Sequence, residues 1–354
     1  MKRFSSLLFK NMLTLGIAGA IGVCLIIHPQ NAVRGIKDGF LLLGNNLIPA
    51  LFPFMVLSSY ISGSSISEMI SKFFEKAFKI IFKTSGYGII PFILGSLGGY
   101  PVGAKTVCEF YENEKISQND AGRLLYWCIN PSPAFAITAI GTFMLKNTQS
   151  GIVLYISCLL SSLTIGFFCR FLSSNEIFPI ESQPSKSKDS IFVKSVSKGS
   201  EGMLSICGWV LTFCVLASIC DGLNLPYTLS NIIKSVGEVT TGCKNAVSSG
   251  ISLPVIASLL GFGGFAVICQ CASYSSVCKV GMKYLICSRL INSALSAIYC
   301  SALLKLFPQC ENVSVVIGTS TATFTLYHSI GASIILIIMC ALLILEVDNR
   351  KKMC

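Results

Sequence analysis

Charged residues are scarce in this sequence of 354 residues, because Asp, Glu, Lys and Arg together make up only 12% of it. A soluble globular domain has about a quarter of its residues charged, so most of this chain avoids water. Hydrophobic residues make up 53% of the sequence. The composition therefore excludes an ordinary soluble enzyme and indicates an all-α polytopic membrane protein.

Histidine is nearly absent, since His28 and His328 are the two in the sequence. The 17 cysteines do not form a metal-binding pattern, because many lie inside apolar runs and lack the repeated two-residue spacing of zinc ligands. They resemble small buried hydrophobic residues. No nucleophile, base and orienting residue form a catalytic pattern either. We expect no metal, no cofactor and no enzymatic activity.

Negative charge is the scarcer of the two signs, since 16 Asp and Glu face 27 Lys and Arg, which leaves a net charge of +11. A nucleic-acid-binding surface would gather basic residues with aromatic ones, whereas here the basic residues fall between apolar stretches. We interpret them as the flanks of membrane spans. The expected partner is the lipid bilayer and not nucleic acid.

Seven apolar stretches are predicted to span the membrane, at residues 12–27, 40–61, 121–145, 152–171, 203–220, 283–306 and 328–346. The first follows basic residues and resembles either a cleaved signal peptide or an anchor, of which we favour the anchor. With the N-terminus in the cytoplasm, most basic flanks lie inside, as the positive-inside rule prefers. The basic C-terminal residues 350–352 would lie outside and disagree with this topology.

Several stretches depart from a plain span. Pro49 and Pro53 predict a kink in 40–61. Lysines at helical spacing in 69–83 predict a helix in the headgroup plane, or alternatively a soluble connector. Glycines in 86–107 and 251–270 predict re-entrant hairpins or broken helices. Pro131 and Pro133 predict a discontinuous helix. Polar stretch 108–120 is expected to be a loop with solvated carboxylates, at Glu109, Glu112 and Asp120.

The two halves of the chain repeat one order of elements: span, amphipathic segment, glycine-broken segment, helix interrupted at an asparagine, and final span. Residues 94–100 (LGSLGGY) echo 260–265 (LGFGGF), and Arg123 precedes Asn130 as Arg289 precedes Asn292. An odd number of predicted spans lies between the two glycine-broken segments, which gives the two halves opposite orientations in the membrane. The predicted divisions are an anchor (1–30), a first repeat (31–172), a cytoplasmic linker (173–200), a second repeat (201–306) and a C-terminal span with tail (307–354).

Matching breaks in inverted halves predict a substrate site near the middle of the membrane. Helix ends exposed there hold anions through their partial positive charge. The glycines could instead serve only close helix packing, Asn130 could merely cap a helix, and Lys105 and Arg289 could reach to the interface. The candidate substrate-binding residues are Gly98, Gly99, Tyr100, Pro101, Lys105, Asn130, Ser132, Gly263, Gly264, Gln270, Arg289, Asn292 and Ser293.

Three strings, GSLGGYPVGAK (95–105), GRLLYWCINPSPAF (122–135) and SLLGFGGFAVICQ (258–270), resemble the YlbJ family of sporulation integral membrane proteins. The resemblance implies two nucleoside-recognition, or gate, domains and a fold like that of concentrative nucleoside transporters. It also implies a role late in endospore formation, in moving dipicolinate through the outer forespore membrane. Within the matching strings, the family motifs cover residues 98–105, Asn130, Gly263, Gly264 and Gln270.

Three functions follow as hypotheses. The first is a secondary transporter that carries a small planar anion, with dipicolinate as the favoured substrate, by alternating access and with or without a coupling ion. Intramembrane cations such as Lys105 and Arg289 suit a dicarboxylate better than a neutral nucleoside. The second is a non-transporting gate-domain protein that assembles with spore-maturation membrane partners. The third is a nucleoside carrier.

Overall fold

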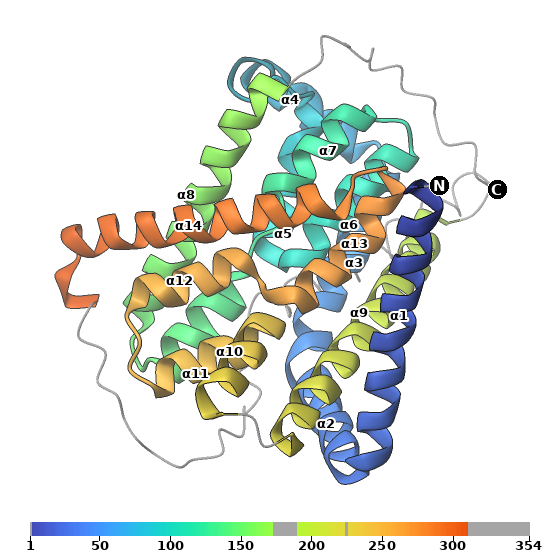
Figure 1. Cartoon of the computed structure of the whole chain (residues 1–354). Coiled ribbons are helices and arrows are strands. Elements are labelled where there is room, and N and C mark those ends of the chain that lie inside the picture. The colour runs from blue at the N-terminus through green and yellow to red at the C-terminus, as the bar shows by residue number, and fades with distance from the viewer. Residues whose placement is uncertain (1, 173–189, 224–225, 311–354) are drawn as a thin grey trace.

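The computed structural model describes residues 2–172, 190–223 and 226–310, which form helices joined by short turns, with no strand in these ranges (Figure 1). Short π-helical or 3-10 turns adjoin several of the helices. The α-helices are α1 (Lys2–Ile27), α2 (Pro29–Leu42), α3 (Ile48–Gly63), α4 (Ile66–Ile81), α5 (Ile89–Gly98), α6 (Tyr100–Glu112), α7 (Gln118–Trp127), α8 (Thr148–Cys169), α9 (Ile191–Gly222), α10 (Tyr227–Gly237), α11 (Val239–Ser248), α12 (Leu253–Phe262), α13 (Gly264–Val277) and α14 (Met282–Leu306).

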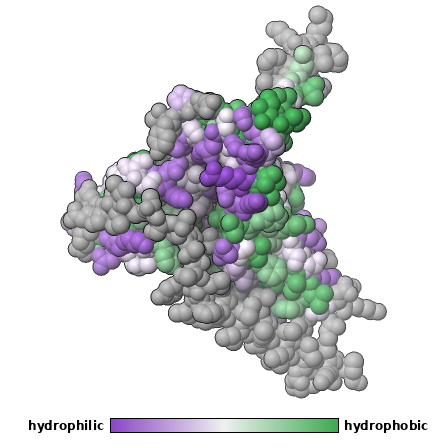
Figure 2. Space-filling view, turned by 90° about the horizontal axis from the view of Figure 1, so that it is seen from below, coloured by the Kyte–Doolittle hydropathy of each residue, from purple (hydrophilic) through white to green (hydrophobic). Residues whose placement is uncertain are grey.

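Four described stretches are long and apolar enough to cross a membrane: Thr148–Leu172, Ile191–Gly222, Leu253–Val277 and Met282–Leu306. Two bent helix pairs raise the count to as many as six. Large apolar side chains are exposed on these stretches, for example Leu204, and apolar side chains also reach the surface shown in Figure 2. Exposed apolar surface of this extent is stable in lipid and not in water. The predicted all-α polytopic membrane protein is confirmed at this level.

The spans show one predicted feature and differ from the prediction in two places. The kink predicted in 40–61 is present, as a 57° bend between Pro29–Asn45 and Ile48–Gly63. Helix α9 begins at Ile191, so the end of the predicted linker is helical. Leu253–Val277, which is not among the seven predicted spans, is a candidate span. The predicted last span, 328–346, and linker residues 173–189 lie outside the described residues.

Helix α4 is amphipathic, as the lysine spacing predicts. Its inner side buries Ser67, Ser71 and Phe78, whereas Phe73 is exposed. The ring of Phe78 stacks on that of Trp127, with centroids 6.4 Å apart. Helix α4 and the stretch Gly86–Gly98 form the second bent pair, with an angle of 99° between them. The bend sets α5 across the direction of α4.

The first glycine break folds the chain back on itself. Helix α5 ends at Gly98, Gly99 has a φ of +102°, and α6 starts at Tyr100. A left-handed φ of this kind favours glycine. A Cβ on Gly95 would lie 2.9 Å from the Cα of Gly103, so the two helices diverge from a tight turn. The prediction of a break here is confirmed.

The second glycine break differs from the first. Gly263 and Gly264 both have a φ of +80°, but α12 and α13 continue across them as one broken helix, Leu253–Val277. Of the two forms predicted for this segment, a re-entrant hairpin or a broken helix, the structure shows the broken helix. Helix α12 packs closely on α14, because a Cβ on Gly261 would lie 2.7 Å from the carbonyl oxygen of Asn292.

The asparagine-interrupted helices also differ between the halves. After α7 the chain runs without helix from Cys128 to Ser132 before a π-helical segment, Ala134–Met144, which confirms the predicted discontinuity. Helix α14 is continuous through Asn292, so the predicted second interruption is wrong. The reason is local: prolines remove backbone donors at the first site, whereas α14 contains no proline and keeps its hydrogen-bond ladder.

Candidate functional site

Two buried asparagines, one from each predicted half, lie against helix α8. The Oδ1 atom of Asn130 accepts a hydrogen bond from Ser162, and that of Asn292 accepts one from Ser161. All four side chains are fully buried. Because Ser161 and Ser162 are neighbours in the chain, α8 joins the first helix break to α14. We call Asn130, Asn292, Ser161 and Ser162 the polar core.

The hairpin of α5 and α6 also contacts the polar core. The Nδ2 atom of Asn130 donates to Ser96 Oγ (3.3 Å) and to the carbonyl oxygen of Trp127 (3.2 Å). The hydroxyl of Tyr155 donates to the carbonyl oxygen of Ser96 (2.9 Å). Asn130 therefore does more than cap a helix, since its side chain links α5, α7 and α8.

Arg289 lies three residues before Asn292 on α14 and is fully buried. Its Nη1 donates to the carbonyl oxygen of Ile129 (2.5 Å) and its Nη2 to that of Tyr126 (2.8 Å). These carbonyls lie at and just beyond the C-terminus of α7, where backbone oxygens lack helical partners and carry partial negative charge. Burial excludes the alternative that Arg289 reaches the membrane interface.

The guanidinium of Arg289 has no carboxylate partner within the described ranges, where the ion pairs involve other residues. Two buried donors beside the polar core also lack hydrogen-bond partners, Arg289 Nε and Asn292 Nδ2. A buried charge without a counter-ion costs several kcal/mol, of the order of the desolvation penalty. The arrangement would be stabilised by an anion that accepts from these donors.

The two glycine breaks meet next to this region. The hydroxyl of Tyr100 donates to the carbonyl oxygen of Leu260 (2.9 Å), near the end of α12. A Cβ on Gly263 would lie 3.5 Å from the Tyr100 ring, and a Cβ on Gly99 would lie 3.7 Å from that of Ser132. The structure thus brings together five of the predicted site residues: Gly99, Tyr100, Ser132, Gly263 and, through α12, Ser293, whose hydroxyl pairs with Ser258 (2.7 Å).

Other predicted residues have packing contacts. A Cβ on Gly98 would lie 2.8 Å from Phe54, and one on Gly264 would lie 3.1 Å from the backbone of Val239, so both allow close approach of other helices. Pro101 is buried in the first turn of α6, where proline is compatible with the missing helical donor. Gln270 is buried on α13.

Lys105 belongs to a different cluster. Its Nζ pairs with Glu109 Oε1 (2.6 Å), donates to Ser59 Oγ, and lies 3.4 Å from the carbonyl oxygen of Met55. Lys105 and Glu109 are each 4% exposed. The alternative that Lys105 reaches the interface is wrong, and so is the expectation that Glu109 is solvated, because residues up to Glu112 are helical in α6 and turn Glu109 toward α3.

The other two carboxylates of the predicted polar loop differ from each other. Glu112 is exposed, as expected. Asp120 is partly buried in α7 and pairs with Arg123, so it is not simply solvated. Arg123 also donates to the carbonyl oxygens of Phe82 (3.2 Å) and Lys83 (2.6 Å) beyond the end of α4. Arg123 and Arg289, matched in the sequence repeat, therefore both bind carbonyls at helix C-termini.

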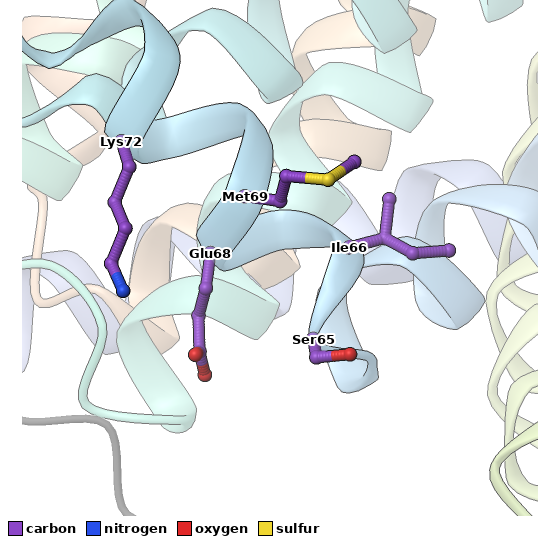
Figure 3. Close-up of a pocket in the computed structure, with 5 residues that line it drawn as sticks. All are labelled: Ser65, Ile66, Glu68, Met69 and Lys72. Carbon is purple, nitrogen blue, oxygen red and sulfur yellow. The ribbon is translucent and has the colours of Figure 1, made fainter.

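Two hollows lie at the surface of the described residues. One, of about 410 Å³, is formed along α4 by Ser65, Ile66, Glu68, Met69 and Lys72, whose charged side chains extend into open space (Figure 3). It contains no buried polar group. The other, a cleft of about 310 Å³ between α6, α9 and α13, reaches Lys105 and Glu109.

The site includes residues that the sequence reading missed, namely Ser96, Ser161, Ser162 and Glu109. A signal for Ser161 and Ser162 was present, since two adjacent hydroxyls inside an apolar span need partners. Within the described residues no group of three His, Cys, Asp or Glu side chains is arranged to hold a metal ion.

The described residues contain four to six candidate spans, and broken helices among them make buried polar contacts. These features define a polytopic helical membrane protein with a polar interior. The chain is 23% identical to the sporulation integral membrane protein YlbJ of Bacillus subtilis (strain 168) over 323 residues, which cover 79% of each chain. The resemblance to YlbJ-type sporulation integral membrane proteins is thereby confirmed. No family model and no solved structure matches the chain.

Proposed function

We propose that this chain is a secondary transporter of endospore formation, which moves dipicolinate across the outer forespore membrane by alternating access. Two observations support the proposal. The relative with 23% identity is a sporulation integral membrane protein. Arg289 is a buried cation without a carboxylate partner among the described residues, placed beside the polar core.

The buried positive charge of Arg289 is the observation that favours an anion as the substrate. An ionisable residue inside a membrane protein is costly and marks a substrate or ion pathway by default. The free Nε of Arg289 and the free Nδ2 of Asn292 are three residues apart on α14, so that one carboxylate could accept from both. Two charge-assisted hydrogen bonds of this kind contribute about 1.5–3 kcal/mol each. A neutral nucleoside would leave the charge uncompensated, which makes the nucleoside carrier the weaker alternative.

The proposed architecture is an inverted repeat of two gate domains, residues 31–172 and 201–306, similar to that of concentrative nucleoside transporters. The contact of the two glycine breaks through Tyr100, and the equivalent roles of Arg123 and Arg289, support it. In this arrangement the α5 and α6 hairpin is re-entrant and the breaks form the moving parts around the substrate.

Reconstitution of the purified chain into vesicles tests the proposal. Uptake of labelled dipicolinate should exceed that of empty vesicles and should saturate. A folded, reconstituted protein that gives no uptake above the background would exclude transport. The alternative, assembly with spore-maturation membrane partners, predicts normal vesicle permeability and loss of co-purified membrane partners when the exposed surface is changed.

A further inference from the structure

The cleft between α6, α9 and α13 leads from the surface to a buried ion pair, Lys105 and Glu109. It has a volume of about 310 Å³, enough for several water molecules. Gly202 of α9 leaves the space open, since a Cβ there would lie 3.3 Å from Cε of Lys105 and 3.0 Å from the hydroxyl of Tyr274. The cleft therefore extends to the Lys105 and Glu109 pair, since both residues line it.

The ammonium of Lys105 is fully bonded. Its three N–H donors face three oxygens, from Glu109, Ser59 and Met55. A carboxylate, a hydroxyl and a backbone carbonyl are also the ligands that a small alkali cation would need at a broken helix. Because the tethered ammonium occupies this position, the cluster has no room for such a cation.

The carboxylate of Glu109 is only half bonded. Its Oε1 accepts from Lys105 (2.6 Å) and from Ser59 (2.6 Å), whereas Oε2 is buried and has no hydrogen-bond partner. The buried hydroxyl of Tyr274, on the opposite side of the cleft, also has no partner. A buried carboxylate oxygen without a donor is an unsatisfied acceptor, which is where a hydrogen could be held.

We propose that Glu109 is the proton-binding site that couples anion transport to proton movement, an inference that rests on the proposed transport function. A proton from water in the cleft binds Oε2, so that the carboxylate becomes a neutral carboxylic acid. Lys105 then loses its counter-charge and becomes free to pair with a carboxylate of the substrate. Release of the substrate restores the ion pair, and the proton returns to water on the other side. One proton and one carboxylate charge thus move together.

The groups around Glu109 agree with this assignment. Helix α3 contributes the Ser59 hydroxyl and the Met55 carbonyl, neither of which titrates near neutral pH. The titratable groups that line the cleft are Lys105, Cys108 and Glu112 of α6, Lys198 and Glu201 of α9, and Tyr274 of α13. Among them Lys105 is the one that contacts Glu109 as an ion pair. Protonation of Glu109 therefore changes the charge balance of Lys105 directly.

The test uses vesicles that contain the full chain, Glu109→Gln, or Glu114→Gln as the matched control. Glu114 is exposed in the turn after α6 and does not line the cleft. Initial dipicolinate uptake is measured with the outside made acidic and again without a pH gradient. The ratio of the two rates should be well above one for the unchanged chain and for Glu114→Gln. For Glu109→Gln the ratio should fall to about one, because glutamine mimics the protonated state.

The result separates the two proposals. Absence of any dipicolinate exchange by the unchanged, folded chain would overturn the transport function. The coupling role of Glu109 would be overturned, with the transport function intact, by either of two results. One is an uptake rate of the unchanged chain that does not depend on the pH gradient, and the other is a gradient dependence that Glu109→Gln retains. Infrared difference spectra between alkaline and acidic buffer give a second measurement that needs no transport. Acidification protonates several carboxylates, so the expected change is the loss of one component of the carboxylic C=O band, which Glu109→Gln removes and Glu114→Gln keeps; a Glu109→Gln spectrum identical to that of Glu114→Gln would contradict the proposal.

Discussion

Replacement of Arg289 by glutamine should weaken dipicolinate transport and fold stability together. The change removes the buried positive charge and at least one of the two bonds to the carbonyls of Ile129 and Tyr126. A charge-assisted hydrogen bond to a substrate carboxylate contributes about 1.5–3 kcal/mol. Its loss corresponds to an increase of roughly 10- to 150-fold in the half-saturating dipicolinate concentration. Each carbonyl left buried and unbonded costs about 1–3 kcal/mol of unfolding free energy.

Arg123→Gln is the matched control for this change. Arg123 also donates to two carbonyls beyond a helix end, those of Phe82 and Lys83, but it already has a carboxylate partner in Asp120. We therefore expect Arg123→Gln to lower the thermal midpoint in detergent without changing the half-saturating concentration. Arg289→Lys retains the charge but not the planar pair of donors, so its half-saturating concentration should lie between those of the unchanged chain and Arg289→Gln.

The assay is concentration-dependent uptake into vesicles, combined with thermal unfolding of the same preparations. If Arg289→Gln and Arg123→Gln lose stability to a similar degree and both keep the original half-saturating concentration, Arg289 is only a helix anchor. The reasoning from its uncompensated charge would then be refuted.

Three further predictions concern packing, charge and topology. Gly103→Ala should lower the unfolding free energy by about 1–3 kcal/mol through overpacking, because its Cβ would clash with the carbonyl oxygen of Cys128. The control is Gly208→Ala, whose Cβ would meet no atom within 4 Å and which should leave the thermal midpoint unchanged or raise it. An equal loss of stability in both variants would contradict the packing of the hairpin. Asn130→Asp should reduce dipicolinate uptake at least tenfold, or about 1.4 kcal/mol, because it adds negative charge to the polar core. Asn113→Asp adds the same charge in an exposed turn and should leave the uptake unchanged. Equal uptake by both variants would count against an anion site. A reporter fused after Lys186 should read cytoplasmic, as the basic linker predicts, and an external reading would reverse the proposed orientation.

The sequence was sufficient to predict the breaks that carry strong local constraints. Pro131 and Pro133 cannot continue a helical hydrogen-bond ladder, so the break there could be predicted from residue type. The break at Gly99 could be predicted in the same way, because its φ of +102° is a conformation that favours glycine. Asn292, which the sequence repeat matches with Asn130, places no such constraint on the backbone. An asparagine side chain that finds a partner on a neighbouring helix, here Ser161, remains compatible with a continuous helix.

The partners of buried charges could not be predicted from the sequence, because they depend on tertiary contacts. Lys105 and Arg289 are equivalent as isolated intramembrane cations. The structure separates them, since Glu109 lies one turn from Lys105 and neutralises it, whereas Arg289 faces backbone carbonyls. Glu109 was missed because the stretch 108–120 is polar in composition, whereas the structure continues α6 through Glu112 and buries its residues as far as Phe110.

The most direct test of the central claim is competition for uptake in vesicles that contain the unchanged chain. Labelled dipicolinate should accumulate above the level of empty vesicles, and an excess of unlabelled dipicolinate should suppress the signal while an equal excess of uridine leaves it intact. Suppression by uridine alone would indicate a nucleoside carrier. Uptake no greater than that of empty vesicles, by a protein shown to be folded, would contradict the assignment of a transporter.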